Sequence, residues 1–260
     1  MKNRKYYTTR IVTYYDIVKS VALRNIKVRY KNSVLGFFWS MLNPLVFLGI
    51  FVFIFSKAFP TIENYPLYAI TGLIFWTFFS TSSNQIISSI IESGAILKSF
   101  SIPPLVFPLS ALVAALVNLA FSFIPFIGLM FFFGFQLKWV TLMIIPIILL
   151  FALFTFGFSL ILCTLNVFFR DVSMFWGTIN PAILYFTPVA YASTLVPEHL
   201  RWLLQVNPLF HFFEIIRDVL YYGRFPSLYY LGTSTAITLV TVTLSVVIFN
   251  KLKRGFISCI

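Results

Sequence analysis

Six stretches of mostly apolar residues, each long enough to cross a bilayer as a helix, constrain this chain more than any other feature. They lie near residues 36–56, 66–90, 105–134, 140–167, 175–195 and 228–250. A helix needs roughly 20 apolar residues to cross the hydrocarbon layer, where backbone polar groups must be bonded internally. The composition agrees, with 60% hydrophobic and 10% charged residues and a mean hydropathy of +0.93. The sequence therefore predicts an all-α polytopic membrane protein, with six transmembrane helices in one domain over residues 1–260.

A basic amphipathic segment, residues 11–35, leads into the first span without a linker. At helical spacing, one face is apolar and the opposite face is polar and largely basic. The apolar face contains Tyr14, Ile17, Val18, Val21, Val28 and Leu35, and the polar face contains Asp16, Ser20, Arg24, Lys27 and Lys31. We expect this helix to lie along an anionic membrane surface. The alternative, a solvated charged face before an anchor, would need only one span.

The net charge of +12 is unevenly distributed, since nine of the nineteen Lys and Arg residues precede Gly36. No basic stripe is interleaved with base-stacking aromatic residues, so the expected partner is anionic lipid and not nucleic acid. All but five basic residues fall on the side of the layout that contains both termini, and the positive-inside rule makes that side cytoplasmic. The first ten residues lack the pattern of a cleavable signal peptide, so Met1 is expected in the cytoplasm.

Two predicted spans contain features that are unusual in lipid. The second span ends in the polar run STSSNQIISS, residues 80–89, which indicates packing against neighbouring helices or, alternatively, a watery path. The fifth span is interrupted by Asn180-Pro181 and Thr187-Pro188, and such breaks are tolerated only where the freed backbone is buried in protein or meets water. Its aromatic residues therefore line either a path or simply the lipid face. They are Phe175, Trp176, Tyr185, Phe186 and Tyr191.

The connections between spans are short on the predicted cytoplasmic side and longer outside. Residues 91–104 form a compact cytoplasmic loop that ends at Pro103-Pro104. The third span contains Pro108 and Pro125, which predicts a tilt or a kink. Outside, residues 197–224 form two short helices divided by Asn207-Pro208, and we expect them to dip into the outer interface without crossing. The second of these helices is expected to present His211, Glu214 and Asp218 on a polar face.

Motifs for catalysis and for metal binding are missing from the sequence. It contains no phosphate-binding loop G-x-x-x-x-G-K-[ST], no G-x-G-x-x-G and no G-x-S-x-G. The two histidines lack a recognised metal-ligand spacing, and Cys163 and Cys259 lie at different levels of the predicted topology. We therefore predict no catalytic residue, no metal site and no cofactor in this chain. Because the spans contain almost no charge, ion-coupled transport is disfavoured, and energy must come from elsewhere.

The run DIVKSVALRNIKVRYKNSVLGFFWSMLNPL, residues 16–45, resembles the N-terminal signature of type-2 ABC exporter permeases of the polysaccharide and polyol-phosphate class. The order of later elements is also similar over roughly residues 12–250. These elements are Gly72 with Trp76 and Phe78, Pro103-Pro104, Phe169-Arg170-Asp171, Asn207-Pro208-Leu209 and the helix from Glu214 to Arg217. The resemblance implies a subunit that exports O-antigen, capsule or teichoic acid across the cytoplasmic membrane.

The resemblance also implies partners and functional residues. Two copies of the permease would assemble with two copies of a separate ATPase that binds ATP and Mg²⁺, and the substrate would be a lipid-linked polysaccharide. The residues expected to couple the permease to the ATPase are Arg24, Lys27, Arg29, Lys31, Glu92, Lys98 and Ser101. The residues expected to line the substrate path are Trp39, Phe175, Trp176, Tyr185, Phe186 and Tyr191. Aromatic faces contact sugar rings weakly enough for a polymer to slide.

Other classes of protein remain open from the sequence. An ABC-2 exporter of small lipids or drugs shares the general fold. An ion-coupled secondary transporter would use an ion gradient and no ATPase. A membrane enzyme acting on lipid-linked sugars would need acidic residues near the interface, and Glu63, Glu198, Glu214 and Asp218 are available, although none forms a paired-carboxylate motif.

Overall fold

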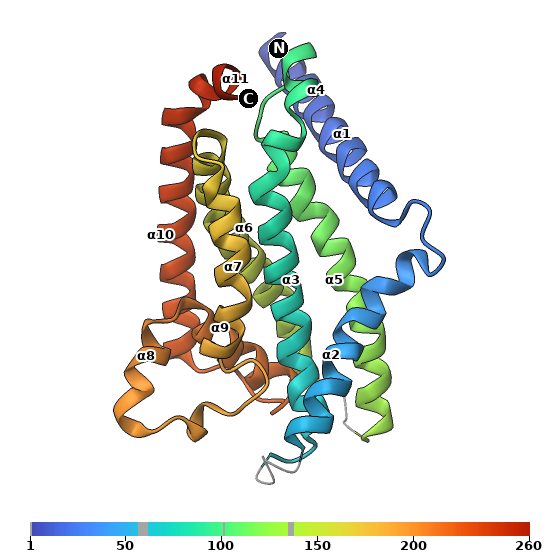
Figure 1. Ribbon diagram of the computed structural model, residues 1–260, viewed down its shortest axis with the longest axis vertical. Coiled ribbons are helices and arrows are strands. Elements are labelled where there is room, and N and C mark those ends of the chain that lie inside the picture. The colour runs from blue at the N-terminus through green and yellow to red at the C-terminus, as the bar shows by residue number, and fades with distance from the viewer. Residues whose placement is uncertain (1, 57–61, 101, 135–137) are drawn as a thin grey trace.

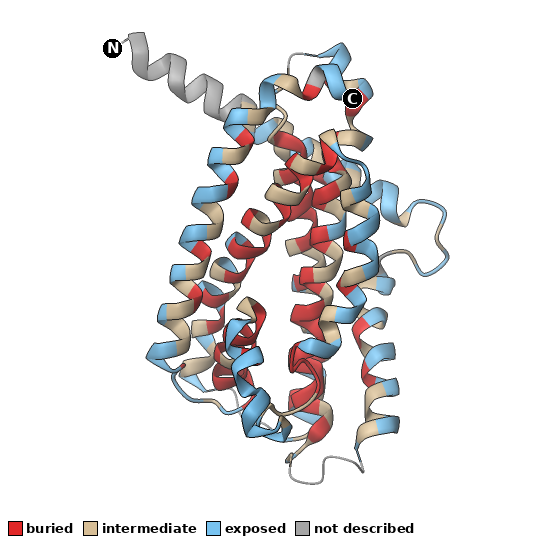
Figure 2. Cartoon of the chain, turned by 60° about the vertical axis from the view of Figure 1, so that its left-hand side comes forward, coloured by how far each residue is buried: buried red, intermediate tan, exposed pale blue. Residues whose placement is uncertain are grey.

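The computed structural model describes residues 2–56, 62–100, 102–134 and 138–260, and their side chains apart from those of residues 2–13, 37 and 257. Every regular element in these ranges is a helix, which confirms the predicted all-α class. Figure 1 shows the long helices running side by side as one bundle. Figure 2 shows that buried residues gather inside this bundle, while exposed residues follow its outer faces.

Six helices correspond to the six apolar segments. They are α2 (Trp39–Phe55), α3 (Tyr65–Glu92), α5 (Val106–Phe132), α6 (Ile144–Phe168), α7 (Asp171–Phe186) and α10 (Leu228–Leu252). Within the described residues, three helical stretches are long and apolar enough to cross a membrane: Val106–Phe132, Trp139–Phe168 and Leu228–Gly255. The stretch from Trp39 to Phe55 is apolar but shorter. These lengths and compositions support an integral membrane protein.

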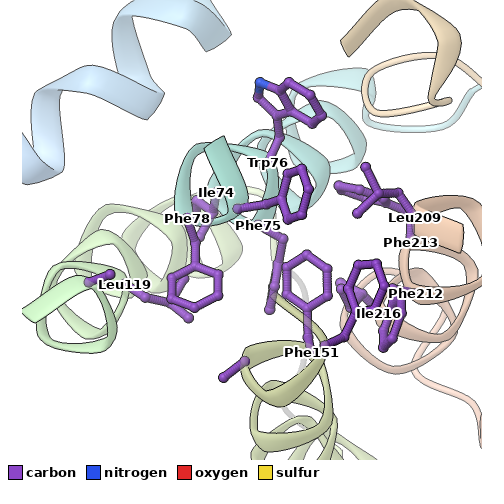
Figure 3. Packing of buried hydrophobic residues seen from close by; sticks show 14 of the residues in the cluster. Ile74, Phe75, Trp76, Phe78, Leu119, Phe151, Leu209, Phe212, Phe213 and Ile216 are labelled. Carbon is purple, nitrogen blue, oxygen red and sulfur yellow. The ribbon is translucent and has the colours of Figure 1, made fainter. Parts of the chain in front are cut away.

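Helix α3 is the central element of the bundle, because it contacts α2, α5, α6, α7 and α9. Phenylalanine rings join it to its neighbours, as Figure 3 shows for Phe75, Phe151 and Phe212. The rings of Phe151 and Phe212 have centroids 5.2 Å apart, and those of Phe154 and Phe212 are stacked at 4.8 Å. Aromatic pairs at such distances contribute about 0.5–1.5 kcal/mol beyond their buried area. The many phenylalanines of this sequence therefore fill the interior as well as the lipid-facing surface.

Small residues allow α6 and α10 to pack closely. A Cβ at Gly157 of α6 would lie 3.1 Å from the Cα of Val242 in α10, so a larger residue would push the two backbones apart. Ser234, Thr238 and Ser245 of α10 are buried in the bundle. Small side chains are common between transmembrane helices, where close backbone approach replaces the hydrophobic driving force of water.

Helix α1 (Lys2–Tyr30) lies against α5 and ends five residues before the predicted limit of the amphipathic segment. The hydroxyl of Ser110 donates to the carbonyl of Val18 at 3.1 Å, and the hydroxyl of Tyr30 donates to Asn118 at 3.1 Å. Ser110 and Asn118 are separated by about 12 Å along α5, at 1.5 Å per residue. Helix α1 therefore packs along α5 over at least this length.

The predicted apolar face of this segment is only partly correct. Tyr14, Ile17, Val18 and Val21 are partly buried. In contrast, Val28 is 61% exposed, and Leu35 is 44% exposed and lies outside the helix. Leu35 departs from the predicted face because the chain leaves the helix after Tyr30, and Asn32 and Gly36, both with positive φ, turn it toward α2.

Different short helices lie at the two ends of the bundle. The N-terminal part of α1, the short helix α4 (Gly94–Ser99) and the C-terminal helix α11 (Phe256–Cys259) lie at one end, and α8 (Arg201–Val206) lies toward the other (Figure 1). Ile260 packs directly on Gly94, where a Cβ would clash with its side chain. The C-terminus of the chain therefore meets the short loop predicted to be cytoplasmic.

The predicted fifth span, 175–195, needs correction. Helix α7 begins at Asp171 and ends at Phe186, and the chain from Thr187 to Ala190 is buried without being helical. Pro188 explains the end of the helix, because the residue before a proline disfavours the helical conformation. The freed backbone groups are buried in protein, as the sequence analysis required of a break at this depth.

The outer region also differs from its prediction. Asn207 divides α8 from α9 (Pro208–Leu220) as expected, and its side chain accepts a hydrogen bond from the amide of Leu209 at 3.0 Å as an N-cap. However, α9 packs against α3, α6 and α10, and its predicted polar face is largely buried. His211 is 2% exposed and Asp218 is 3% exposed. This helix is therefore part of the core and not a surface element.

Candidate functional site

The outward face of α7 presents three of the predicted path residues. Phe175, Tyr185 and Phe186 are 66%, 71% and 73% exposed, respectively. Phe175 and Phe186, eleven positions apart, lie within about 20° of each other around the helix axis, whereas Tyr185 is rotated by about 80° from Phe175. Their exposure leaves them accessible to a ligand, and their assignment to a substrate path stays a prediction.

Trp176 lies on the opposite side of α7 and is buried, unlike its predicted path partners. Its indole N–H donates to the hydroxyl of Ser83 in α3 at 3.1 Å, and its ring packs against Phe158 with centroids 5.1 Å apart. One turn later, the amide of Asn180 donates to the hydroxyl of Ser80 at 2.9 Å. The polar run 80–89 thus serves helix packing through these serines, and Trp176 holds α7 on α3.

Tyr191 lies in the segment after α7 and is half-buried. Its hydroxyl donates to the carbonyl of Tyr185 at 3.0 Å, and its own carbonyl accepts from the hydroxyl of Tyr68 at 3.1 Å. This residue therefore ties the end of α7 to α3. Tyr191 follows α7 in sequence, and its hydrogen bonds hold the chain in position after that helix.

A cavity of about 320 Å³ lies where the connection between α1 and α2 meets α3 and α5. Trp39, the predicted path residue of α2, lines it together with Arg29, and Trp39 is 50% exposed. Four apolar side chains, Ile74, Phe78, Ala115 and Leu119, also line it, and the remaining side chains are polar. They are Tyr30, Ser33, Ser40, Asn43, Thr77, Thr81, Asn118 and Ser122. The structure therefore separates Trp39 from the aromatic residues of α7 and places it in a polar cavity inside the bundle.

The predicted coupling residues are exposed where the structure describes them. Arg24, Lys27 and Arg29 project from α1, and Lys31 follows the end of that helix. Glu92 ends α3, Lys98 lies in α4 and is exposed, and Ser101 lies outside the described residues. Arg24, Arg29 and Glu92 line one further cavity, of about 340 Å³, between α1, α3 and α5. The structure thus brings three of these residues together and leaves Lys27, Lys31 and Lys98 on the surface.

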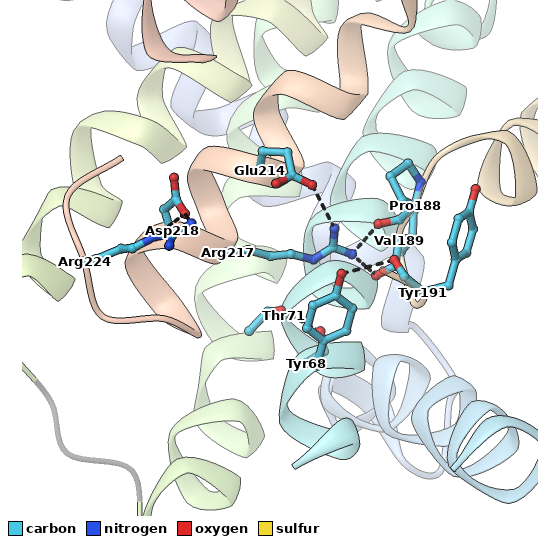
Figure 4. Close-up of polar contacts among 9 residues, drawn as sticks. All are labelled: Tyr68, Thr71, Pro188, Val189, Tyr191, Glu214, Arg217, Asp218 and Arg224. Atoms are coloured by element: carbon cyan, nitrogen blue, oxygen red, sulfur yellow. Dashed lines mark hydrogen bonds and ion pairs between the residues drawn. The ribbon is translucent and has the colours of Figure 1, made fainter. Parts of the chain in front are cut away.

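Arg217 of α9 is the most deeply buried charge in the described part of the chain, with 1% of its side chain exposed. Figure 4 shows its guanidinium directed at the non-helical segment after α7. It donates to the carbonyls of Pro188 and Val189, the latter at 2.8 Å. It also lies 3.7 Å from a carboxylate oxygen of Glu214 and 4.3 Å from the ring centre of Tyr68. Arg217 therefore connects α9, α3 and the segment after α7.

Chemistry at acidic side chains has little support in the geometry. Within the described ranges, no three His, Cys, Asp or Glu side chains gather in a way that could hold a metal ion. Asp218 forms an ion pair with Arg224, in which nitrogen and oxygen are 2.7 Å apart, and it accepts a hydrogen bond from the amide of Ser227 at 3.2 Å. His211 contacts the carbonyl of Gln205 at 2.9 Å. Asp218 therefore stabilises the turn after α9, and His211 ties α9 to α8.

Sequence reasoning missed most residues of the polar cavity. A signal was present, because Thr77 and Thr81 in α3 and Asn118 and Ser122 in α5 are pairs spaced by four residues, and such pairs share a helix face. Two polar pairs of this kind in separate apolar spans indicate that the spans face each other across a polar space. The role of Arg217 gave no comparable signal, because its partners are backbone carbonyls.

The bundle of apolar helices, with polar cavities inside it and a basic surface at one end, defines an integral membrane transport subunit. The model of the ABC-2 type transporter family matches residues 17–221, and the chain belongs to this family. It is 35% identical over 248 residues to the O-antigen export system permease protein RfbA of Klebsiella pneumoniae, covering 93% of this chain and 94% of that protein.

More distant relatives also match over most of the chain. The O-antigen export system permease protein RfbA of Myxococcus xanthus is 29% identical over 246 residues, covering 94% of this chain and 95% of that protein. The polysialic acid transport protein KpsM of Escherichia coli is 25% identical over 245 residues, covering 85% and 89%. These relatives are transport subunits and not enzymes.

Proposed function

We propose that this protein is the membrane subunit of an ATP-driven exporter that moves a lipid-linked cell-surface polysaccharide, such as O-antigen, out of the cytoplasm. The observation that carries the proposal is the 35% identity to an O-antigen export permease over 93% of the chain. The sequence contains no ATP-binding motif, so ATP and Mg²⁺ bind in a separate ATPase subunit.

The proposed topology has six spans in the cytoplasmic membrane, with both termini, α1 and α4 in the cytoplasm. The excess of Lys and Arg at that end supports this orientation. Two copies of the chain and two ATPase subunits form the transporter, because six helices packed around a filled core leave too little room for a glycan within one copy. The exposed faces of α2 and α7 then line the space between the two copies.

The proposed path is aromatic and weakly binding. Phe175, Tyr185 and Phe186 on α7 offer flat apolar faces to sugar rings, and Trp39 offers another at the cavity of α2. Contacts of this kind orient a sugar without holding it through many hydrogen bonds. A polymer can advance stepwise only if each contact is favourable and easily released. Trp176 and Tyr191 position α7 for this role.

Coupling to the ATPase is proposed to use the basic surface of α1 and the loop that contains α4. We expect Lys27→Glu with Lys31→Glu to weaken association with the ATPase about tenfold or more, because charge reversal places like charges in contact. Co-elution of the two subunits in lipid measures this effect. The matched control is Lys138→Glu with Arg201→Glu, which makes the same charge change toward the outer end. Equal association of both double variants would contradict the coupling assignment.

The whole proposal is tested by co-expressing the chain with the ATPase encoded nearest to it and purifying the pair in lipid. We expect stable co-elution and an ATP hydrolysis rate that changes when lipid-linked glycan is added. Stimulation by teichoic acid or by small lipids or drugs, and not by a lipid-linked glycan, would instead assign one of the alternative ABC-2 cargoes. Transport driven by an ion gradient with no ATPase partner would contradict the proposal, as would chemical conversion of the glycan.

A further inference from the structure

A cleft between α1, α3 and α5 contains the unusual combination of two arginines and several uncharged donors. Arg24 and Arg29 of α1 line one wall, and Gln85 and Ser89 of α3 line another. Glu92 is the acidic residue of the lining, which therefore carries two positive charges and one negative charge. The cavity volume is about 340 Å³, which is in the range of small-molecule sites.

The two arginines are available for a ligand. Neither forms an ion pair within the described ranges, and Glu92, although it lines the same cleft, lies beyond ion-pair distance of both. A guanidinium presents a planar fork of donors that matches the oxygens of a phosphate group, and such charge-assisted bonds are strong. Gln85 adds an amide donor. The chemistry of the cleft therefore fits a phosphate or diphosphate.

Arg29 also lines the polar cavity that contains Trp39, so the two cavities meet at this residue. The lining of the Trp39 cavity includes an indole ring, two amides at Asn43 and Asn118, and the hydroxyl of Thr81. An aromatic face with amide and hydroxyl groups around it is the chemistry that orients a sugar ring. A phosphate beside Arg29 would thus be followed directly by a site suited to a sugar.

An apolar surface suited to a lipid chain lies beside these cavities. Helix α2, which begins at Trp39, exposes Phe47, Ile50, Phe53 and Ile54, and Phe53 is 89% exposed. A molecule with a hydrocarbon chain, a phosphate group and a sugar could therefore contact all three environments at once. An ordinary phospholipid would use only two of them, because it offers no sugar to the Trp39 cavity.

We propose that the cleft of Arg24 and Arg29, together with the Trp39 cavity, binds the diphosphate and the first sugar of a polyprenyl-linked glycan. The proposal rests on the proposed function and names the part of the substrate that this chain recognises. The arginines hold the diphosphate, Trp39 contacts the first sugar, and the apolar face of α2 receives the hydrocarbon chain. Recognition then depends on the lipid-proximal end of the glycan and not on its length.

The test is equilibrium binding to the complex of the full chain with its ATPase in lipid nanodiscs, without ATP. The probes are a polyprenyl diphosphate bearing one hexose, the same lipid without the sugar, and phosphatidylglycerol. We expect Arg29→Ala to weaken binding of both diphosphate lipids about tenfold. Lys19→Ala is the matched control, because it removes one positive charge from the exposed face of the same helix away from the cleft. It should leave the affinity unchanged.

A second variant separates sugar recognition from charge. Trp39→Leu should weaken binding of the hexose-bearing lipid about fivefold to tenfold and leave the sugar-free lipid unaffected, because it removes the aromatic face that contacts the sugar ring. Equal losses for Arg29→Ala and Lys19→Ala would overturn the proposal, since general surface charge would then explain the affinity. Equal affinity of phosphatidylglycerol and the hexose-bearing lipid would also overturn it, in favour of a structural phospholipid site.

The failure of this inference can be distinguished from failure of the proposed function. If glycan stimulates ATP hydrolysis while Arg29→Ala binds the diphosphate lipids normally, the function stands and the site is wrong. If the Arg29 and Trp39 effects on binding are found while glycan does not alter ATP hydrolysis, the site stands and export of that glycan is wrong.

Discussion

Replacing Arg217 with methionine is expected to lower the free energy of unfolding by about 3–5 kcal/mol, the usual effect of removing one partner from a buried ion pair. The guanidinium donates to the carbonyls of Pro188 and Val189 and lies beside Glu214. Methionine fills a similar volume but leaves both carbonyls without this donor and the carboxylate without its nearest cation. Unfolding by denaturant in lipid-like micelles measures the loss.

Two further variants control this prediction. Arg201→Met removes an exposed arginine whose oxygen partner on Glu198 is 3.5 Å away, and it should change stability by less than about 1 kcal/mol. Arg217→Lys keeps the charge but not the planar fork, so it should recover only part of the loss. A methionine variant as stable as the Arg201→Met variant would show that Arg217 does not hold the segment after α7.

The effect of Arg217→Met should depend on pH through Glu214. Burial raises the pKa of this carboxyl above its ordinary value, and the guanidinium of Arg217 opposes the shift. Without Arg217 the folded-state pKa rises further, and a raised pKa makes the folded form most stable below the unfolded pKa and less stable as the pH increases through the folded one. The destabilisation should therefore be smaller in mild acid than at neutral pH.

Gly72→Ala is expected to cost about 1–3 kcal/mol or more, because the added Cβ would overlap the carbonyl oxygen of Val189. This obstacle is backbone, and Val189 is itself held by Arg217, so a side-chain rotation cannot relieve the clash. The segment after α7 would move away from α3, and the contact of Tyr68 with Tyr191 would lengthen. Thermal unfolding and protease sensitivity near Val189 measure the change.

Gly128→Ala is the matched control for this variant. Gly128 lies within α5, and a Cβ there would meet nothing within 4 Å. Alanine favours helix by about 1 kcal/mol over glycine, so this variant should be as stable as the original protein or slightly more stable. If Gly72→Ala were equally well tolerated, the close approach of α3 and the segment after α7 would be wrong.

Most helices were predictable from the sequence, because apolar length is a property of neighbouring residues. The segments 105–134 and 140–167 correspond closely to α5 and α6. The predicted fifth span was less accurate, since a hydropathy pattern does not distinguish a helix from buried irregular chain. Thr187 to Ala190 are apolar enough to continue a span, but Pro188 ends the helix, and Arg217 donates hydrogen bonds to the carbonyls of Pro188 and Val189.

The candidate site was predicted only in part. Phe175 and Phe186 share a face because eleven residues are close to three whole turns of a helix. Trp176 belongs to the same aromatic group in sequence, but the hydroxyl of Ser83 in another helix decides that it points inward. The cleft joins Arg24 and Arg29 to Glu92 only because α1 packs along α5 beside the end of α3.

The sequence by itself determined the class of this protein, the approximate position of its long helices and the basic character of one end, since each depends on local composition and period. Only the tertiary structure decided that α9 is core, that Arg217 binds backbone carbonyls and that Arg29 connects two cavities. These features join residues far apart in the chain through close contacts between helices. Such contacts depend on how side chains of different helices interdigitate, which no local pattern in one helix specifies.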